Sequence, residues 1–253
     1  MTVLITGSAG TIGTALMRRL PALGWDVRGF DRENGQDITV PADLDAATPN
    51  VTAIVHLAGQ PTEAPWPAIR DANIEGTFQV FEAARRAGVR RIVYASSNHA
   101  TGFTPVTSEL PADAPPRPDT LYGVSKVFAE ALARYYVDRY DMQVACLRIG
   151  TFADAPPDTR SLSTWLSPDD SARLVDACLR APDLTYALVW GISKNTRRTW
   201  ALDSAFALGY RPQDDAEDHR DAVPEGSAYP SDAFVGGGFT SEGFGIDEVA
   251  ARS

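Results

Sequence analysis

Residues 2–13 read TVLITGSAGTIG, and this stretch decides the fold. The first five residues of the stretch are apolar or β-branched and stop at a glycine, which predicts a short β-strand. Further glycines follow at a spacing of three, and an apolar helical pattern begins at Ile12. A strand, a glycine-rich turn and a helix in this order are typical of a dinucleotide-binding site, because the helix N-terminus attracts phosphates. A glycine-rich turn without a ligand is the alternative, and the complete context disfavours it.

The three glycines have separate tasks in such a turn. Gly7 permits the tight turn, Gly10 lets the backbone approach the pyrophosphate, and Gly13 lets the helix pack near the strand. The spacing is GxxGxxG rather than GxGxxG, and this variant suits a site of the short-chain dehydrogenase type.

The end of the second predicted strand, over residues 26–30, favours NAD as the cofactor. Asp31 follows this strand, where a carboxylate can accept hydrogen bonds from the ribose hydroxyls and would repel a 2′-phosphate. Arg32 could instead pair with that phosphate, and Asp31 could simply cap a turn. We expect NAD, with both residues at the cofactor.

Strand-like and helical segments alternate along the chain, which predicts an α/β fold with a doubly wound parallel sheet of the Rossmann type. We expect residues 1–150 to form the NAD-binding domain. Residues 151–253 are predicted to form a small substrate-binding lobe, partly integrated with the main sheet. The other predicted strands cover 51–58, 91–95, 142–149 and 184–190, and the predicted helices cover 68–87, 121–140, 168–179 and 200–208.

Composition and charge describe a globular protein without a nucleic-acid or membrane partner. Of the 253 residues 44% are apolar and 22% are charged, and the formal net charge of −10 disfavours anionic partners. No apolar stretch reaches the length of a membrane span and the first strand leaves no room for a signal peptide, so we expect a cytoplasmic protein. Cys146, Cys178 and the three histidines have no metal-ligand spacing, so we expect buried cysteines and no metal site.

Residues 122–126 read YGVSK and supply a candidate base. Tyr122 and Lys126 stand four residues apart, so they share one face of a helix, for which Asp119 and Thr120 are candidate N-caps. An ammonium beside a phenol favours the phenolate, so we expect the pKa of Tyr122 to fall toward neutrality. The pattern alone is weak, because a half-buried tyrosine and a solvated lysine would read the same.

The strand predicted over 91–95 runs directly into Ser96 and Ser97. A serine hydroxyl at this strand end can hydrogen-bond the reacting oxygen of a substrate while Tyr122 takes the proton. One of the two serines could serve only as a cap for the strand end.

Several segments together carry a family resemblance. TGSAGTIG, HLAG, NIEGTFQVFEAAR, YASS and YGVSK resemble the extended short-chain dehydrogenases/reductases, the superfamily of NAD-dependent epimerases and dehydratases. Longer stretches resemble uronate dehydrogenases, and they are SSNHATG (96–102), RPDTLYGVSK (117–126), LRIGT (147–151), RSLSTWLSPDD (160–170) and VWGISKN (189–195). This resemblance runs nearly end to end and weakens in the acidic tail.

The resemblance implies oxidation of C1 of cyclic D-glucuronate or D-galacturonate by NAD, which gives an aldarolactone. It makes Tyr122 the base, Lys126 its partner and Ser97, rather than Ser96, the serine of the triad. The expected contacts of the sugar acid are Ser97, Asn98, His99, Thr151 and Arg160, with Thr62 as a further candidate. The expected contacts of the cofactor are Gly7, Gly10, Thr11, Ile12, Gly13, Asp31, Arg32, Asp43, Leu44, Leu57, Ala58, Gly59, Tyr122, Lys126 and Ile149.

The chemistry of arginine agrees with this substrate. A guanidinium binds a carboxylate through two parallel hydrogen bonds, and Arg160 is well placed by sequence order. A solvent-exposed loop arginine is the alternative. Asn98 and His99 could bind sugar hydroxyls or only satisfy backbone groups of their loop.

Some positions depart from the uronate dehydrogenase pattern. Pro61 stands where a serine usually touches the substrate, so only Thr62 could replace that hydroxyl, and Thr151 stands where serine is usual. A sugar-nucleotide epimerase or dehydratase is the second hypothesis, although the chain after Lys126 is short for a nucleotide-binding lobe. A non-catalytic NAD-binding module is the third, although such proteins typically lose the tyrosine or the lysine. We expect a homo-oligomer.

Overall fold

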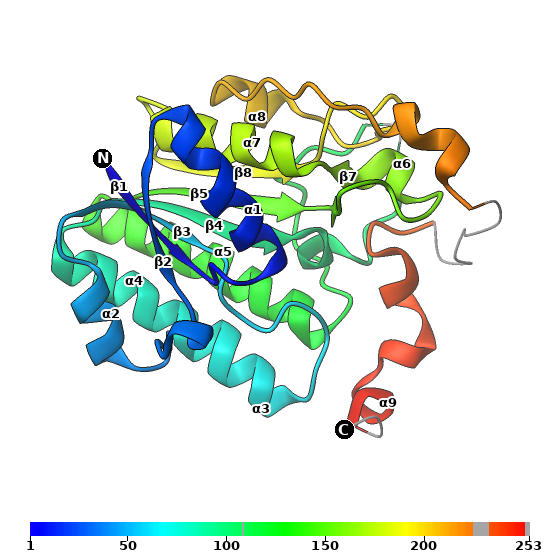
Figure 1. The fold of residues 1–253 in the computed structure, drawn as a ribbon. Helices are drawn as coiled ribbons and strands as arrows, with labels where there is room; N and C mark the ends of the chain where they lie inside the picture. The colour runs from blue at the N-terminus through cyan, green and yellow to red at the C-terminus, as the bar shows by residue number, and fades with distance from the viewer. Residues whose placement is uncertain (108, 225–232, 251–253) are drawn as a thin grey trace.

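A six-stranded parallel β-sheet forms the centre of the molecule (Figure 1). The computed structural model describes residues 1–107, 109–224 and 233–250. The strands lie in the order β2-β1-β3-β4-β5-β8, and every neighbouring pair is parallel. Their bounds are Thr2–Thr6 for β1, Asp26–Phe30 for β2, Val51–His56 for β3, Arg91–Ser97 for β4, Gln143–Ile149 for β5 and Tyr186–Gly191 for β8.

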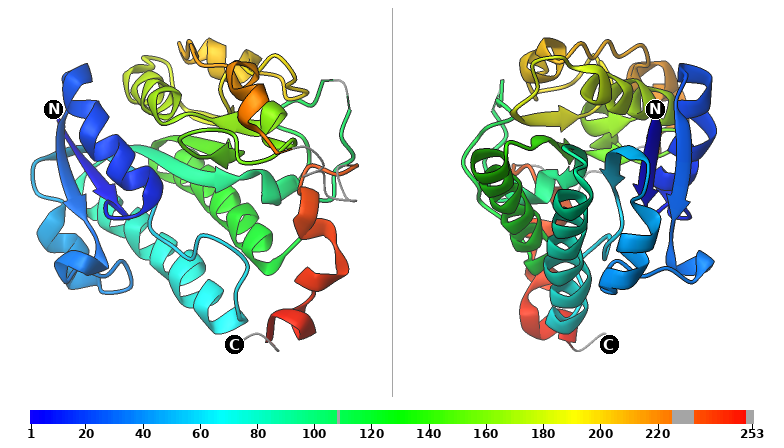
Figure 2. Two further views of the ribbon diagram at one scale, coloured as in Figure 1. Left: turned by 45° about the vertical axis from the view of Figure 1, so that its right-hand side comes forward. Right: turned by 90° about the vertical axis from the view of Figure 1, so that its left-hand side faces the viewer.

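Helices cover both faces of this sheet (Figures 1 and 2). One face carries α1 (Thr11–Arg19) and α7 (Pro168–Arg180). The other face carries α2 (Pro41–Ala47), α4 (Gly76–Ala87) and α5 (Leu121–Tyr140). The alternation of strands and helices confirms the predicted doubly wound α/β fold.

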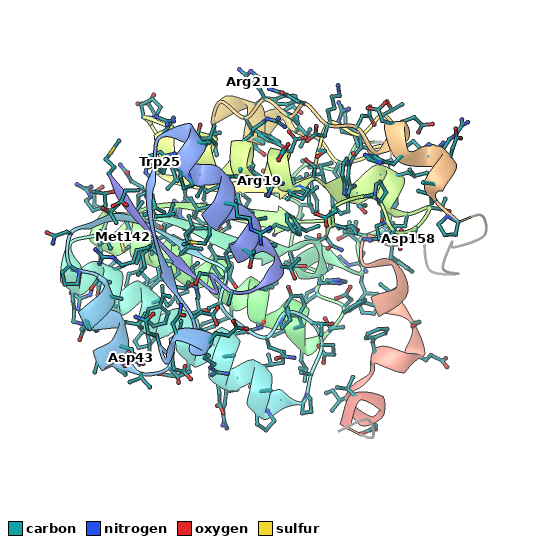
Figure 3. All side chains as sticks on the ribbon, in the orientation of Figure 1. Arg19, Trp25, Asp43, Met142, Asp158 and Arg211 are labelled. Atoms are coloured by element: carbon teal, nitrogen blue, oxygen red, sulfur yellow. The ribbon has the colours of Figure 1, made fainter. Side chains whose placement is uncertain are left out.

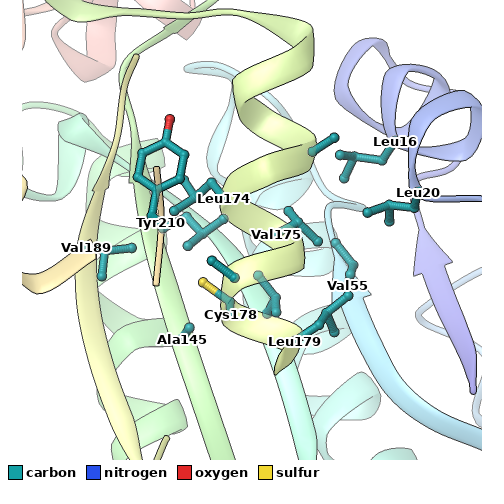
Figure 4. Packing of buried hydrophobic residues seen from close by; sticks show 14 of the residues in the cluster. Leu16, Leu20, Val55, Ala145, Leu174, Val175, Cys178, Leu179, Val189 and Tyr210 are labelled. Carbon is teal, nitrogen blue, oxygen red and sulfur yellow. The ribbon is translucent and has the colours of Figure 1, made fainter. Parts of the chain in front are cut away.

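The core on the α1 and α7 side is closely packed (Figure 4). Leu174, Val175 and Cys178 point from α7 toward the sheet, and Leu16 of α1 and Leu20, which directly follows α1, lie beside them. Each such side chain stabilises the fold by about 1.5–3 kcal/mol through burial. Both cysteines of the chain are free and buried, as predicted.

The strand order places a crevice at the carboxyl ends of the strands. The chain passes from β1 outward to β2 and returns to β3 on the other side of β1. In open α/β sheets ligands bind outside the carboxyl ends of the strands at such a reversal. Thr6 at the end of β1 is aligned with His56 at the end of β3, so the segments that follow these strands meet at the carboxyl ends of the sheet.

The helix predicted over 68–87 is interrupted in the structure. A π-helical segment, Arg70–Glu75, joins α3 (Trp66–Ile69) to α4. Asn73 in this segment is buried, and its side chain bonds the backbone N–H and C=O of Gln60 and the hydroxyl of a serine in α5. A π-bulge is not visible in hydrophobic periodicity, and such bulges are frequent at functional sites.

A second, small sheet and the C-terminal segment lie over the carboxyl ends of the main strands. The small sheet pairs β6 (Thr151–Phe152) with β7 (Trp165–Leu166) in parallel, and α6 (Ser161–Thr164) lies between them in sequence. The helix predicted over 200–208 is limited to α8 (Asp203–Ala207). β8 comes after residue 150 in sequence but belongs to the main sheet. The division of the chain into two domains at residue 150 stays a prediction.

The C-terminal segment returns to the loop that follows β4. Backbone hydrogen bonds of 2.8–2.9 Å join Val106 to Ala233, Val235 to Thr104, and Gly236 to Gly102. Figure 1 shows this segment in red at the end of the molecule where β4 and β5 terminate. Its helical turns are Gly237–Thr240, Glu242–Phe244 and α9 (Ile246–Ala250).

A buried ion pair holds the segment around Ala112 and Ala114, in the proline-rich part of the chain, against the sheet. Nε and Nη2 of Arg148 donate to the two carboxylate oxygens of Glu130 at 2.9 and 2.8 Å. Nη1 of Arg148 donates to the carbonyls of Ala112 and Ala114 at 2.9 and 2.8 Å. The arginine side chain is 1% exposed, so both charges depend on this pairing.

We expect Arg148→Met to destabilise the protein by about 3–5 kcal/mol, because it leaves the carboxylate of Glu130 buried without a counter-charge. Urea unfolding followed by circular dichroism measures this loss. Arg134→Met is the matched control, because Arg134 pairs with Asp138 on the surface and its side chain is 58% exposed. The control should lose less than about 1 kcal/mol. Equal losses in the two variants would contradict the prediction.

Candidate active site

A cavity of about 650 Å³ opens at the carboxyl ends of the parallel strands. Its volume is typical of a small-molecule or cofactor site. Most of the residues predicted for the site line this one cavity. They are Gly7, Gly10, Thr11, Ile12, Gly13, Asp31, Arg32, Leu57, Ala58, Gly59, Ser97, Asn98, His99, Tyr122, Lys126 and Ile149.

The glycine turn has the geometry that a bound pyrophosphate needs. Gly7 has a φ of +73°, and a Cβ there would lie 2.7 Å from the backbone nitrogen of Ala58. A Cβ at Gly13 would lie 2.1 Å from the carbonyl oxygen of Gly7. Gly10 is the N-cap of α1 and offers no side chain to the N–H groups of the first helical turn. Those N–H groups therefore stay available to an anion in the cavity.

The acidic residue after β2 is held in place at the cavity. Asp31 accepts hydrogen bonds from the backbone nitrogens of Ala9 and Glu33 at 3.0 and 3.1 Å. Nε of Arg32 donates to the carboxylate of Asp37 at 2.8 Å. The positive charge of Arg32 is thus already paired, which favours an unphosphorylated ribose at this end.

Tyr122, Lys126 and Ser97 meet at the other end of the cavity. Thr120 caps α5 by accepting from a first-turn N–H at 3.0 Å, and the helix brings Tyr122 and Lys126 onto one face as predicted. Nζ of Lys126 lies 5.2 Å from the centre of the Tyr122 ring and donates to the carbonyl of Ala95 at 2.8 Å. The side chain of Ser97 lies near that of Tyr122, where it acts to lower the pKa of the phenol.

The pKa of Tyr122 differs from the sequence-based expectation. Burial raises this pKa to about 12, although the hydrogen bond from Ser97 opposes the rise. The expected lowering by Lys126 was wrong for the ligand-free protein, because the ammonium lies over the ring and is bound to a carbonyl. Burial also lowers the pKa of Lys126 to about 8.

The two serines at the end of β4 have different environments. The hydroxyl of Ser96 donates to the buried carboxylate of Glu130 at 2.6 Å and is therefore part of the ion pair with Arg148. The hydroxyl of Ser97 accepts from the backbone nitrogen of His99 at 3.2 Å, lies 3.5 Å from Oδ1 of Asn98, and is near Tyr122 in the cavity. The geometry agrees with the preference for Ser97.

The predicted sugar-acid contacts are linked through one carbonyl group. The carbonyl oxygen of Val235 accepts from Nδ2 of Asn98 at 3.0 Å and from Nη2 of Arg160 at 2.7 Å. Nη1 of Arg160 lies 3.5 Å from the hydroxyl of Thr151. A residue close to the C-terminus thus sets the distance between the amide of Asn98 and the guanidinium of Arg160.

Some predicted residues do not line the cavity. Asp43 binds the backbone nitrogen of Asp37, and Leu44 is fully buried in the core beneath α2. Figure 3 labels Asp43 and Asp158 on opposite sides of the molecule. Asp158 directly precedes the turn that carries Arg160. The predicted residues outside the cavity lining are Asp43, Leu44, Thr62, Thr151 and Arg160.

Three further residues at the cavity were not predicted as functional. Phe239 lines the cavity and packs against His99, with ring centres 4.2 Å apart and the rings tilted by 33°. Glu63 accepts from the backbone nitrogen of Tyr122 at 2.7 Å, and burial raises its pKa. Asp119, considered above only as a cap, binds His99 instead. Their roles depend on contacts between distant segments, and the sequence around them carries no signal for these contacts.

Within residues 1–107, 109–224 and 233–250, no helix is long and apolar enough to cross a membrane. The same residues contain no group of three or more acidic, histidine or cysteine side chains that could hold a metal ion.

Comparison with known proteins identifies relatives of the chain. The model of the NAD dependent epimerase/dehydratase family matches residues 3–185. A uronate dehydrogenase of Agrobacterium fabrum is 40% identical over 92% of this chain and 93% of its own length. An NAD-dependent glucose-6-phosphate dehydrogenase of Haloferax volcanii is 37% identical over 85% of this chain and 94% of its own. A crystal structure of a mutant uronate dehydrogenase from Agrobacterium tumefaciens, complexed with NAD, superposes with a TM-score of 0.86 and 36% identity, over 94% of this chain and 96% of that one.

Proposed function

The chain belongs to the NAD dependent epimerase/dehydratase family, and we propose that it is an NAD-dependent oxidoreductase that oxidises C1 of a cyclic hexuronic acid, D-glucuronate or D-galacturonate, to an aldarolactone. The observation that carries this proposal is the convergence of Tyr122, Lys126 and Ser97 with the glycine turn in one cavity. Self-association and a cytoplasmic location remain part of the proposal.

The residues of the turn and of the adjoining strand ends would hold NAD. The N–H groups at the start of α1 bind the pyrophosphate, and Asp31 binds the hydroxyls of the adenosine ribose. Lys126 would hold the ribose of the nicotinamide. NAD supplies the acceptor for the hydride that leaves C1 of the sugar.

The proton of the C1 hydroxyl is transferred to Tyr122. Its phenolic oxygen, as the phenolate, takes this proton, and the hydroxyl of Ser97 donates a hydrogen bond to the reacting oxygen. The side chains of Tyr122 and Ser97 are both almost fully buried, which holds them in place at the cavity.

Arg160 binds the sugar carboxylate. Its guanidinium is anchored by Val235 and lies close to Thr151, which leaves it oriented beside Asn98. A charge-assisted, two-pronged bond to a carboxylate is strong and selective for planar anions.

An absorbance assay tests the proposed function. The purified protein with NAD should form NADH when D-glucuronate or D-galacturonate is added. A protein that is folded and binds NAD but turns over neither sugar acid would refute the proposal. UDP-glucose, glucose and glucose 6-phosphate complete the panel, since they distinguish a sugar-nucleotide enzyme and other sugar dehydrogenases.

One relative favours a second candidate substrate. The relative from Haloferax volcanii is named a glucose-6-phosphate dehydrogenase, and a phosphate at C6 is an anion at the same carbon as the carboxylate of a uronate. This chain also has Pro61 and Thr151 where uronate dehydrogenases usually have serine. Faster turnover of glucose 6-phosphate than of either uronate would establish the second candidate.

Asp31→Ser is expected to weaken the preference for NAD. Loss of the carboxylate removes repulsion of a 2′-phosphate, so the ratio of NAD to NADP use should fall by roughly one to two orders of magnitude. Adding Asp37→Asn frees Arg32 to meet the phosphate and should lower the ratio further. Initial rates with each cofactor measure both steps. An unchanged ratio in the double variant would show that selectivity lies elsewhere.

A further inference from the structure

The carboxylate of Asp119 is completely enclosed at the sugar end of the cavity. Its side chain is 0% exposed. Gly102 and Gly236 close over it so tightly that a Cβ at either position would lie 1.9 Å from Oδ2. A carboxylate that is removed from water in this way needs strong hydrogen-bond partners.

Two side chains supply these partners. Nδ1 of His99 lies 2.8 Å from Oδ2 of Asp119. The hydroxyl of Thr120 donates to Oδ1 at 3.0 Å. Because a carboxylate only accepts, Nδ1 of His99 must carry the proton of this bond. The neutral imidazole then has no proton on Nε2, which becomes a hydrogen-bond acceptor.

Ring contacts fix the orientation of the same imidazole. The ring of His99 packs against Phe239, with centres 4.2 Å apart, and meets the edge of the Tyr122 ring at 5.8 Å. His99 lines the cavity, and Nε2 has no hydrogen-bond partner within the described part of the chain. The nitrogen opposite Asp119 is therefore the one that a ligand can reach.

We propose that Asp119 is a positioning residue, which holds His99 with the proton on Nδ1 so that Nε2 accepts a hydrogen bond from a hydroxyl of the sugar. The identity of this hydroxyl-bearing ligand rests on the proposed function, whereas the state of the imidazole does not. Glu63 also interacts electrostatically with His99, but its carboxylate binds the backbone nitrogen of Tyr122. The arrangement selects a donor, so a ligand with an ether or a deoxy position at this point loses the bond.

Nitrogen NMR of the ligand-free protein tests the positioning directly. The chain has three histidines, and His99→Gln assigns the signals of His99 by difference. At a pH where the imidazole is neutral, we expect Nδ1 of His99 to be protonated and Nε2 to be bare. Asp119→Asn should populate both tautomers. A proton on Nε2 in the unaltered protein, or shifts that do not respond to Asp119→Asn, would overturn the proposal whatever the substrate is.

Asp170→Asn is the matched control for the loss of a buried carboxylate. Its side chain is also 0% exposed and pairs with Arg173, but it bonds the backbone nitrogens of Gln213 and Asp214 instead of a cavity residue. This variant should lose stability and leave the nitrogen shifts of His99 and the KM for the sugar unchanged. If Asp170→Asn shifted the signals of His99 as much as Asp119→Asn does, the shifts would report a general loss of stability and not the contact between Asp119 and His99.

Kinetics of a double variant show whether Asp119 acts through His99. Asp119→Asn should raise the KM for the uronate by roughly 10-fold, the size expected for the loss of one hydrogen bond to the sugar, with a smaller change in kcat. In the His99→Gln background the same substitution should add nothing. Additive effects would contradict the proposal. Unfolding curves of both variants identify any loss of folded protein, and the NMR experiment on the unaltered protein does not depend on them.

Discussion

Tyr122→Phe is expected to slow turnover of the sugar acid by roughly 100- to 10,000-fold, the usual contribution of a positioned general base. Phe keeps the ring that packs beside Lys126 and removes only the phenolic oxygen. The affinity for NAD and the free energy of unfolding should therefore change little. Steady-state rates from NADH absorbance, NAD titration by fluorescence and urea unfolding measure the three quantities.

The ligand-free pKa of Tyr122 adds a pH dependence to this prediction. At a pKa of about 12, almost all of the phenol is protonated near neutral pH, and only the deprotonated form is a base. The kcat/KM of the unaltered enzyme should therefore rise with pH, since this ratio reports groups of the free enzyme. The positive charge of oxidised NAD near the phenol would lower the pKa in the complex, so kcat should reach its plateau at a lower pH. Tyr122→Phe should lose the rise in both parameters.

Tyr94→Phe is the matched control for the loss of a buried phenol. The centre of the Tyr94 ring lies 5.1 Å from Nζ of Lys126, and Tyr94 does not line the cavity. This variant should keep its turnover. If Tyr122→Phe and Tyr94→Phe lost activity equally, the effect would belong to Lys126 or to packing, and Tyr122 would not be the base.

The parts of the site that the sequence predicted are set by short-range geometry. Tyr122 and Lys126 share a face because they are one helical turn apart, and the glycines of 7–13 are needed wherever a strand turns sharply into a helix. The doubly wound sheet follows in the same way from alternating strands and helices. These features require only the order and spacing of residues, which a sequence contains.

The parts that could not be predicted depend on contacts between distant segments. The pKa of Tyr122 is set by burial, which no local pattern reports. The carbonyl of Val235 reaches Asn98 and Arg160 only because the C-terminal segment folds back onto the loop after β4. Asp119 stands at a position that suits an N-cap, and the enclosing glycines that make it a buried partner of His99 come from other segments.

Arg160→Met is expected to raise the KM for glucuronate by roughly 100-fold, because one charge-assisted hydrogen bond contributes about 1.5–3 kcal/mol and a factor of ten corresponds to 1.4 kcal/mol. The net charge of −10 repels an anionic substrate. The overall electrostatic potential of the protein therefore does not make up for the loss of the positive charge at Arg160. The affinity for NAD should stay the same, since Arg160 is not among the residues that line the cavity with the glycine turn. Rates over a range of glucuronate concentrations measure the change.

The decisive quantity is the ratio of kcat/KM for a charged sugar to kcat/KM for a neutral sugar. Glucose has the ring of glucuronate without the carboxylate, so Arg160→Met should lower kcat/KM for glucuronate and leave that for glucose almost unchanged. Arg197→Met controls for the loss of a positive charge, because Arg197 pairs with Glu217 on the surface and should affect neither sugar. If Arg160→Met lowered kcat/KM equally for both sugars, Arg160 would serve to hold Val235 and Asn98 in place. Another group would then have to recognise the carboxylate. The collapse of selectivity for glucuronate alone would instead establish that the guanidinium meets the anion.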